Sequence, residues 1–286
     1  MQSAVFSIVP YGRQQGSRGW PAPADDYSAE VAQSSMQRAL EHFEVADQLG
    51  FDWVTVAEHH FSPASLTPNP MVMAGAVAQR VKRAKIALLG SNVPIQNPVR
   101  VAEEFAMLDT LTGGRLIAGM LRGTTNEYVT YGVNPAESRE RFAEALDLIV
   151  RAWTEPQPFG WLGRYYEYRT ISIWAPLASA RGHAGGLRIS TANPAADEAA
   201  ARAGYYGRDT ERQRSRLQAG GDIDERIETA QLLLGSPATV LAQVDRLRRE
   251  LGVGIVELAF IAPGPDLVRR SLELFGTEVL PRMHEL

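Results

Sequence analysis

The sequence predicts an α/β domain built on parallel strands, a (β/α)8 TIM-type barrel. In its first half, a short apolar, β-branched segment, a loop and an amphipathic helix recur four times, about 30 residues apart, which is the period of βαβ units. Polar residues gather after these strands and not before them. A doubly wound sheet fits the same pattern, but no Gly-x-Gly-x-x-Gly turn follows any strand, so the barrel is favoured.

Each element of the first half is predicted from its own residues. The helix expected at 30–49 carries Met36, Leu40 and Phe43 on one stripe, and Gly50 suits the left-handed position that ends a helix. Proline fits the first turn of a helix, so Pro70 and Asn97-Pro98 begin the next two helices. The expected strands are 4–9, 53–56, 85–90 and 115–119, and the two later helices run over 70–81 and from 98 to the Gly113-Gly114 stop.

The second half is less regular. A helix is expected at 138–153, then an aromatic hairpin or extended insertion around 160–173, and a weak fifth strand at 187–190 with an Ala-rich helix behind it. Ser236-Pro237 begins a clear helix to 251, a strong strand follows at 254–261, and a terminal helix runs from 265 to 286. We predict one domain over 1–286, with an aromatic insertion at 156–180 and a charged, mobile loop at 205–230.

Composition excludes several classes of protein. The 286 residues are 45% hydrophobic and 22% charged, as in an ordinary globular protein, and the net charge of −4 gives no electrostatic case for nucleic acid. With 0 cysteines there is no disulfide and no Cys-ligated metal, and the 5 histidines show no metal-like spacing, so no metal site is expected. No apolar run is long enough to span a membrane, and the N-terminus lacks the pattern of a signal peptide. A cytoplasmic enzyme is the expectation.

The candidate site lies at the ends of the strands. Glu58, His59 and His60 closely follow the second strand. Packing of the core does not require three titratable side chains at this position. In parallel barrels and sheets the carboxyl ends of the strands carry the chemistry. Strand alternation sends His60 to the side opposite His59, so we expect a structural role for His60. Other candidates at the mouth are Ser91 and Asn92 after the third strand, and Arg122, Gly123, Glu127 and Tyr128 after the fourth.

Four ordered segments resemble the bacterial luciferase-like flavin monooxygenases. No single segment is specific for the family, but the four segments in this order are. Together they cover residues 4–155 and 232–286. The segments are Gly50-Phe51-Asp52 running to Glu58-His59-His60-Phe61 and Asn69-Pro70; Pro98-Val99-Arg100 running to Leu108-Asp109 and Gly114-Arg115; Gly119, Arg122-Gly123 and Tyr131-Gly132; and Gly235-Ser236-Pro237 with Leu274-Phe275-Gly276 and Val279-Leu280-Pro281.

The resemblance implies a barrel that binds reduced FMN (FMNH2) at the carboxyl ends of its strands and reacts it with O2 to oxygenate a small organic substrate. His59 stands at the family's active-site histidine, where it would act as a general base or hold the flavin–oxygen adduct. Glu58, Ser91, Asn92, Arg122, Gly123 and Tyr128 are the expected cofactor-binding residues. Arg122 would bind the flavin phosphate or the ring carbonyls. Glu58 would either orient a neighbouring residue or pair with Arg122. Ser91-Asn92 lie at the position where the family often has a non-prolyl cis peptide.

The resemblance leaves rivals open. Some relatives use the deazaflavin F420 for hydride transfer, and a catalytically silent flavin-binding protein is the rival from another class. A separate flavin reductase and a homodimer formed through 70–81 and 98–108 are the expected partners, with neither nucleic acid nor membrane. The sequence departs from the family between Trp174 and Gly235, where one convincing strand is found, so the barrel is either shortened between strands five and seven or a stretch there is left out of the numbering.

Overall fold

The computed structural model describes residues 1–12, 21–174, 223–228, 231–262 and 264–286 of the chain. They fall in two compact units, one formed by Met1–His183 with Gly254–Leu286 and the other by Ala184–Val253. The expected fifth strand at 187–190, its helix and most of the expected mobile loop at 205–230 lie outside the described residues. The single-domain expectation therefore stays a prediction.

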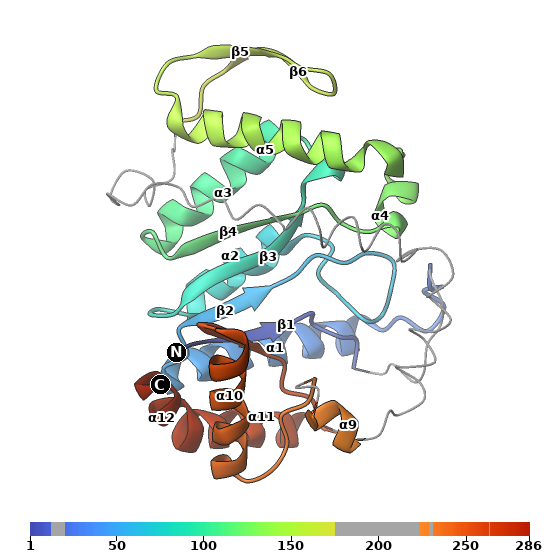
Figure 1. The fold of residues 1–286 in the computed structure, drawn as a ribbon. Helices are drawn as coiled ribbons and strands as arrows, with labels where there is room; N and C mark the ends of the chain where they lie inside the picture. Colours follow the sequence, from blue (N-terminus) through green and yellow to red (C-terminus); the bar gives the residue numbers. More distant parts are fainter. Residues whose placement is uncertain (13–20, 175–222, 229–230, 263) are drawn as a thin grey trace. The chain divides into compact units, whose positions relative to one another are not determined.

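The first unit is built on a five-stranded parallel sheet of order β4-β3-β2-β1-β7 (Figure 1). Each strand is short and apolar, as expected of strands covered on both faces. Four strands follow one another in the sheet as in the sequence, and the last strand of the chain pairs with the first. The strands are β1 Gln2–Ser7, β2 Trp53–Val56, β3 Lys85–Asn92, β4 Leu116–Leu121 and β7 Ile255–Leu258.

The helices between the strands begin and end at the residues that the sequence indicates. Asn69 accepts the N–H groups of Met71 and Val72, Asn97 accepts that of Arg100, and Gly50 takes the left-handed conformation with φ 93°. Each cap of this kind stabilises its helix by about 1 kcal/mol. The helices of this unit are α1 Ala29–Leu49, α2 Pro70–Arg80, α3 Pro98–Thr112, α4 Thr125–Thr130, α5 Ser138–Thr154, α11 Pro265–Leu274 and α12 Leu280–Glu285, with short 3-10 turns at Val93–Ile95 and Pro135–Glu137.

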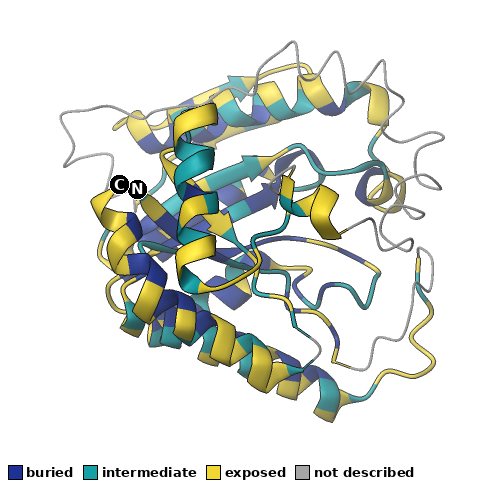
Figure 2. Ribbon diagram, turned by 60° about the horizontal axis from the view of Figure 1, so that its bottom comes forward, coloured by how far each residue is buried: buried dark blue, intermediate teal, exposed yellow. Residues whose placement is uncertain are grey.

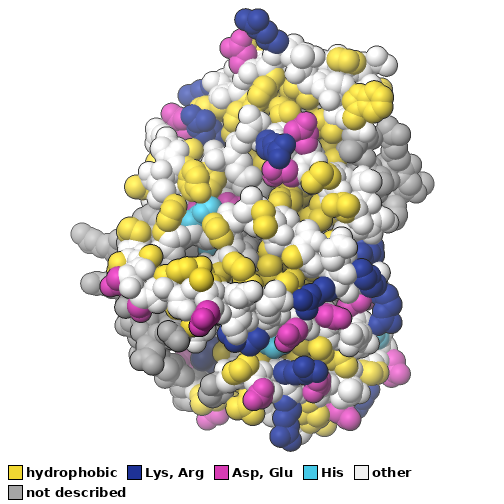
Figure 3. Space-filling view, turned by 180° about the vertical axis from the view of Figure 1, so that it is seen from behind, with side chains coloured by type: hydrophobic (Ala, Val, Ile, Leu, Met, Phe, Trp, Pro, Cys, Tyr) yellow, Lys and Arg dark blue, Asp and Glu magenta, His cyan; other side chains and the backbone are white. Residues whose placement is uncertain are grey.

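The core lies between the sheet and the inner stripes of these helices, which appear as dark blue bands in Figure 2. Phe43 of α1 and Phe105 of α3 are fully buried, and burying an aromatic side chain of this kind contributes about 1.5–3 kcal/mol. Seen from behind, the surface carries many hydrophobic side chains, and charged side chains are most numerous in the lower part of the view (Figure 3). Among the described residues, no helix is both long enough and apolar enough to cross a bilayer.

Several element boundaries differ from the expectation. The strand β1 ends at Ser7 and not at 9, because Val9 turns out of the strand with φ 50°. The final strand β7 ends at Leu258 because Phe260 leaves the sheet to pack against Phe51 and Phe275, with ring centroids 6.1 and 5.7 Å away. The expected terminal helix is interrupted by a π-helical turn at Phe275–Val279.

The expected aromatic hairpin is confirmed. The strands β5 Phe159–Leu162 and β6 Glu167–Ile171 pair antiparallel as a sheet of their own. In the second unit, the described helices are α9 Ile223–Glu228 and α10 Pro237–Leu251, and α10 has the predicted bounds. Ser236 caps α10 by accepting the N–H of Thr239, and Gly252 ends it in the left-handed conformation.

Candidate active site

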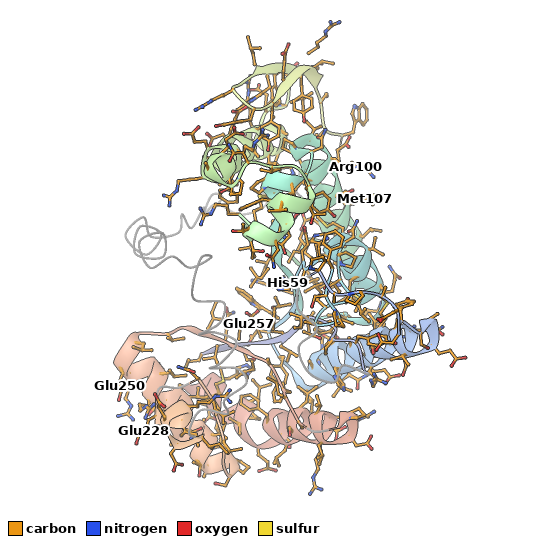
Figure 4. The ribbon with its side chains drawn as sticks, turned by 90° about the vertical axis from the view of Figure 1, so that its right-hand side faces the viewer. His59, Arg100, Met107, Glu228, Glu250 and Glu257 are labelled. Atoms are coloured by element: carbon orange, nitrogen blue, oxygen red, sulfur yellow. The ribbon has the colours of Figure 1, made fainter. Side chains whose placement is uncertain are left out.

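His59 and His60 lie on opposite sides of the segment that follows β2. Glu58 and His60 share one side, because the His60 Nε2 and Glu58 Oε1 atoms are hydrogen-bonded at 2.9 Å. His59 points the other way, and 48% of its side chain is exposed, whereas the side chain of His60 is 4% exposed (Figure 4). The structure thus agrees with the expectation that His60 has an internal role and His59 faces open space.

Glu58 is the centre of a buried network that joins the ends of β2 and β3. Its side chain is 1% exposed, and its Oε2 atom accepts the Asn92 N–H at 3.1 Å and the Gln96 side-chain amide at 2.9 Å. The same Gln96 amide nitrogen donates to Ser91 Oγ at 3.0 Å. Both carboxylate oxygens of Glu58 are therefore engaged within the protein, as a buried charge requires.

Tyr131 connects this network to the segment after α4. Its hydroxyl lies 3.2 Å from His60 Nδ1. Tyr131, His60 and Glu58 thus form one hydrogen-bonded chain through the two ring nitrogens of His60. Burial raises the pKa of Tyr131 above its ordinary value, and so do the negative charges of Glu58 and Glu127. The phenol accordingly stays protonated at neutral pH and remains a donor.

A pocket of about 290 Å³ lies over the Glu58–His60 side. It reaches from the buried network to the first turns of α2 and α3, and Figure 4 places Arg100 on α3 away from His59. Its lining residues are Glu58, His60, Pro68, Asn69, Pro70, Met71, Ser91, Ile95, Gln96, Asn97, Arg100, Glu104 and Tyr131. His59 does not line it, so the predicted site residues divide between two sides of the sheet end.

On the other side, His59 faces the turn after β4. Its Nδ1 atom lies 4.0 Å from Glu127 Oε1, which is within ion-pair range but too long for a hydrogen bond. The other oxygen of Glu127 accepts the Thr124 N–H at 2.8 Å and the Thr124 hydroxyl. The first of these bonds, with the Glu127 N–H that the Thr124 side chain accepts, forms the capping box of α4. The cap holds Glu127 in place, so its free oxygen keeps a fixed position near His59.

The expected residues of the third and fourth strands also come together. Gly123 takes φ 83°, a conformation that favours glycine, and a Cβ atom there would lie 3.2 Å from Asn92 Cγ. Tyr128 is 4% exposed, and its hydroxyl donates to the Arg122 carbonyl, which places it behind the turn. Among the described residues the Arg122 guanidinium makes no ion pair, so it can bind an anion or a carbonyl.

One alternative left open by the sequence is narrowed, and one expectation needs correction. Of the two roles considered for Glu58, the geometry supports the orientation of a neighbour, since its partner is His60 and, within the described part of the chain, not Arg122. The non-prolyl cis peptide lies between Leu89 and Gly90 and not at Ser91-Asn92. Gln96 was not anticipated as a site residue. Its contacts depend on a 3-10 turn after β3 for which a lone glutamine gives no signal.

Comparison with known proteins decides the family. The family of luciferase-like monooxygenases matches residues 18–207. The chain belongs to the luciferase-like monooxygenase family. Within it, the 4-hydroxyprotoasukamycin monooxygenase of Streptomyces nodosus subsp. asukaensis is 30% identical over 179 residues, which are 60% of this chain and 46% of that protein. The chain spans less than half of the length of the curated relatives that it matches first, between 32% and 46%.

Solved structures of family members share the fold. The monooxygenase RslO1 from Streptomyces bottropensis superposes with a TM-score of 0.76 at 23% identity, covering 99% of both chains. The oxygenating constituent of 3,6-diketocamphane monooxygenase from Pseudomonas putida, solved with FMN, gives a TM-score of 0.70 at 18% identity, covering 99% of this chain and 98% of that one. The predicted luciferase-like α/β fold with a parallel sheet is thereby confirmed.

Proposed function

We propose that this family member is an FMNH2-dependent monooxygenase that oxygenates a small organic substrate. The observation that carries the proposal is His59, a half-exposed imidazole at the carboxyl end of β2, held on the side opposite the buried Glu58–His60 pair. In a parallel α/β fold this is the end of the sheet at which substrates and cofactors bind.

Residues at the carboxyl ends of β2 and β4 fit a flavin. Arg122 offers a guanidinium without an ion pair among the described residues, which suits a phosphate or a pair of ring carbonyls. Gly123, in the same turn, has no side chain, so a ligand can approach its backbone closely. The Thr55 hydroxyl of β2 is buried without a hydrogen-bond partner in the described part of the chain. Reduced FMN would supply two electrons, so that one atom of O2 enters the substrate and the other leaves as water.

His59 would hold and move the proton. An imidazole can accept a proton and return it at neutral pH, and the nearest carboxylate oxygen, Glu127 Oε1, lies 4.0 Å from His59 Nδ1. Glu58 and His60 act indirectly, since their network fixes the backbone on either side of His59. We further propose that a separate reductase delivers the FMNH2 and that the organic substrate binds beside His59.

The test is a titration of the purified protein with anaerobically reduced FMN, followed by mixing with air-saturated buffer while the return of oxidised FMN is recorded. We expect saturable binding and a delayed return of oxidised FMN, with the delay shortened about 100-fold in His59→Ala. His284→Ala, which changes an exposed histidine on α12, is the matched control and should behave as the wild type. A failure to bind FMNH2 would contradict the proposal.

The same experiment separates the rivals. Hydride transfer from reduced F420 to an acceptor without O2 uptake would identify an F420-dependent oxidoreductase instead. Tight flavin binding with an unchanged rate of flavin reoxidation, and without turnover of any acceptor, would identify a silent flavin-binding protein.

A further inference from the structure

A second pocket lies on the loops that follow β1 and β2. It measures about 280 Å³ and is lined by Tyr11, Pro21, Ala22, Pro23, Ala24, Asp26, Tyr27, Phe61, Ser62, Pro63 and Leu66. Asp26 and Ser62 are its only lining residues with charged or hydroxylated aliphatic side chains, and the rest are aromatic rings, prolines, alanines and one leucine. A small-molecule site typically has such an apolar lining with a few polar groups.

Backbone hydrogen bonds hold the two loops together around this pocket. The Tyr11 N–H donates to the Pro63 carbonyl, the Ala22 N–H to the Phe61 carbonyl and the Leu66 N–H to the Val9 carbonyl, each at 2.9 Å. The pocket is therefore a preformed feature of two crosslinked loops, which lowers the ordering cost of binding.

Its aromatic wall is fixed as well. Tyr11 is 7% exposed, and its hydroxyl donates to the Asp26 carbonyl at 3.1 Å and accepts the Ser28 N–H at 2.8 Å. The ring of Tyr27 stacks on that of Tyr11, with centroids 6.1 Å apart and planes 19° from parallel, yet 60% of Tyr27 is exposed. A tyrosine ring anchored on one face and open on the other is a surface on which a flat ring can stack.

The pocket borders the loop that carries the candidate active-site histidine. Phe61, which lines it, follows His59 by two residues, and the His59 N–H donates to the Thr67 carbonyl at 3.3 Å, next to the pocket residue Leu66. The Phe61 ring also contacts the rings of His60 and Tyr131, with centroids 5.6 and 6.4 Å away. A group seated in the pocket would thus be held by the loop that positions His59.

We infer that this pocket, called here the Tyr27 pocket, is a substrate subsite that takes a flat, uncharged aromatic ring system. The inference rests on the proposed function, because it gives that function a substrate class. A cavity of about 150 Å³ holds one benzene ring, so about 280 Å³ has room for two fused rings. The small share of charged lining disfavours an ionic group, and the stacked tyrosines favour a planar ring over a puckered one.

The experiment is calorimetric titration of the flavin-free protein with 2-naphthol and, for comparison, with decahydro-2-naphthol, which has the same skeleton without flat rings. We expect saturable binding of 2-naphthol and weaker binding of its saturated counterpart. Tyr27→Ala should weaken the binding of 2-naphthol about three- to tenfold, and Tyr27→Phe should keep it. Ala24→Trp adds an indole at an exposed position of the pocket wall and should abolish binding without disturbing the core.

Leu162→Ala, on the remote β5–β6 hairpin, is the control and should bind as the wild type. The inference is wrong if 2-naphthol does not saturate, if the two ligands bind equally well, or if either Tyr27→Ala or Ala24→Trp, folded by circular dichroism, binds 2-naphthol like the wild type. Because the titration needs neither FMN nor O2, its failure is distinguishable from a failure of the proposed function.

Discussion

At the scale of single residues, the pair His59-His60 shows what a sequence can and cannot reveal. Two adjacent histidines after a strand must point to opposite sides, so their different surroundings could be predicted from alternation alone. The partners of His60 could not, because Tyr131 is 71 residues away and meets His60 only through the packing of α4 against the sheet end. Local patterns predict direction, whereas contact partners depend on tertiary structure.

Asp47 on α1 carries a prediction about acid stability. Its carboxylate accepts the N–H groups of Lys82, Arg83 and Ala84 at 2.9, 3.0 and 2.6 Å, which fixes the turn between α2 and β3. Burial would raise the pKa of Asp47, but the three N–H groups and the charge of Arg83 outweigh it and lower the pKa below 3.8. A carboxyl whose pKa is lower in the folded state stabilises the fold above its unfolded pKa and ceases to do so as the pH falls.

Asp47→Asn should therefore lower the free energy of unfolding at pH 7 by about 1.5–3 kcal/mol, the range for a hydrogen bond to a charged group. The loss should shrink as the pH falls below about 4, where the wild type also loses the charge. Urea unfolding between pH 3 and 7 measures both effects. Glu273→Gln on the exposed face of α11 is the control, with an expected change below about 1 kcal/mol. An equal loss for Asp47→Asn at pH 3 and pH 7 would contradict the charge argument.

At the scale of elements, boundaries were predictable where a cap marks them. The helix α10 has the predicted bounds because Ser236-Pro237 and Gly252 specify both of its ends locally. The strand β7 was predicted too long, because residues 254–261 are apolar apart from Glu257 and contain no turn residue after Gly254, and only the packing of Phe260 against Phe51 and Phe275 shows where the strand ends. A strand end without a turn residue depends on tertiary contacts.

The β5–β6 hairpin depends on one carboxylate of α5. Glu144 accepts the backbone N–H groups of Arg164, Tyr165 and Tyr166, each at 3.0 Å, and the Trp161 indole N–H at 3.2 Å. Glu144→Ala should release the hairpin from α5, because four donors lose their acceptor at once. Hydrogen exchange should then become at least tenfold faster at residues 164–166 and stay unchanged in β2 and β3.

Glu144→Gln keeps one acceptor oxygen and should give an intermediate rate, which separates the lost hydrogen bonds from the lost side chain. Unchanged protection at residues 164–166 in Glu144→Ala would show that the hairpin is held by other contacts. The cation–π contact of Arg141 with the Tyr165 ring, 4.7 Å from its centroid, would be the first candidate.

At the scale of the whole molecule, the sequence predicted the parallel α/β architecture and the family, because four β-loop-α units and the ordered motifs lie within residues that fold as expected. The shortening considered between strands five and seven falls on residues 175–222, which lie outside the described part of the chain. The strand ends indicated the candidate residues and the opposite directions of His59 and His60, whereas the contacts of Gln96 with Glu58 and of Tyr131 with His60 depend on the three-dimensional structure.

The surface of α2 and α3 supports the proposal of a homodimer. Val72 of α2 and Met107 and Leu111 of α3 are 73%, 60% and 58% exposed, and α2 packs beside α3. Large exposed apolar side chains gathered on one face are typical of an interface. A second copy of the chain related by a two-fold axis would cover the same face on both subunits.

Met107→Arg would bring two like charges into such an interface and remove apolar contact, and should therefore dissociate the dimer. Light scattering after size exclusion should give twice the chain mass of 31.3 kDa for the wild type and a single mass for the variant. Leu162→Arg, at a side chain that is 85% exposed on the β5–β6 hairpin, should remain dimeric. If the wild type is a monomer, the proposal is wrong. If Leu162→Arg dissociates while Met107→Arg does not, the subunits pair through the hairpin, and the exposed residues of α2 and α3 need another explanation.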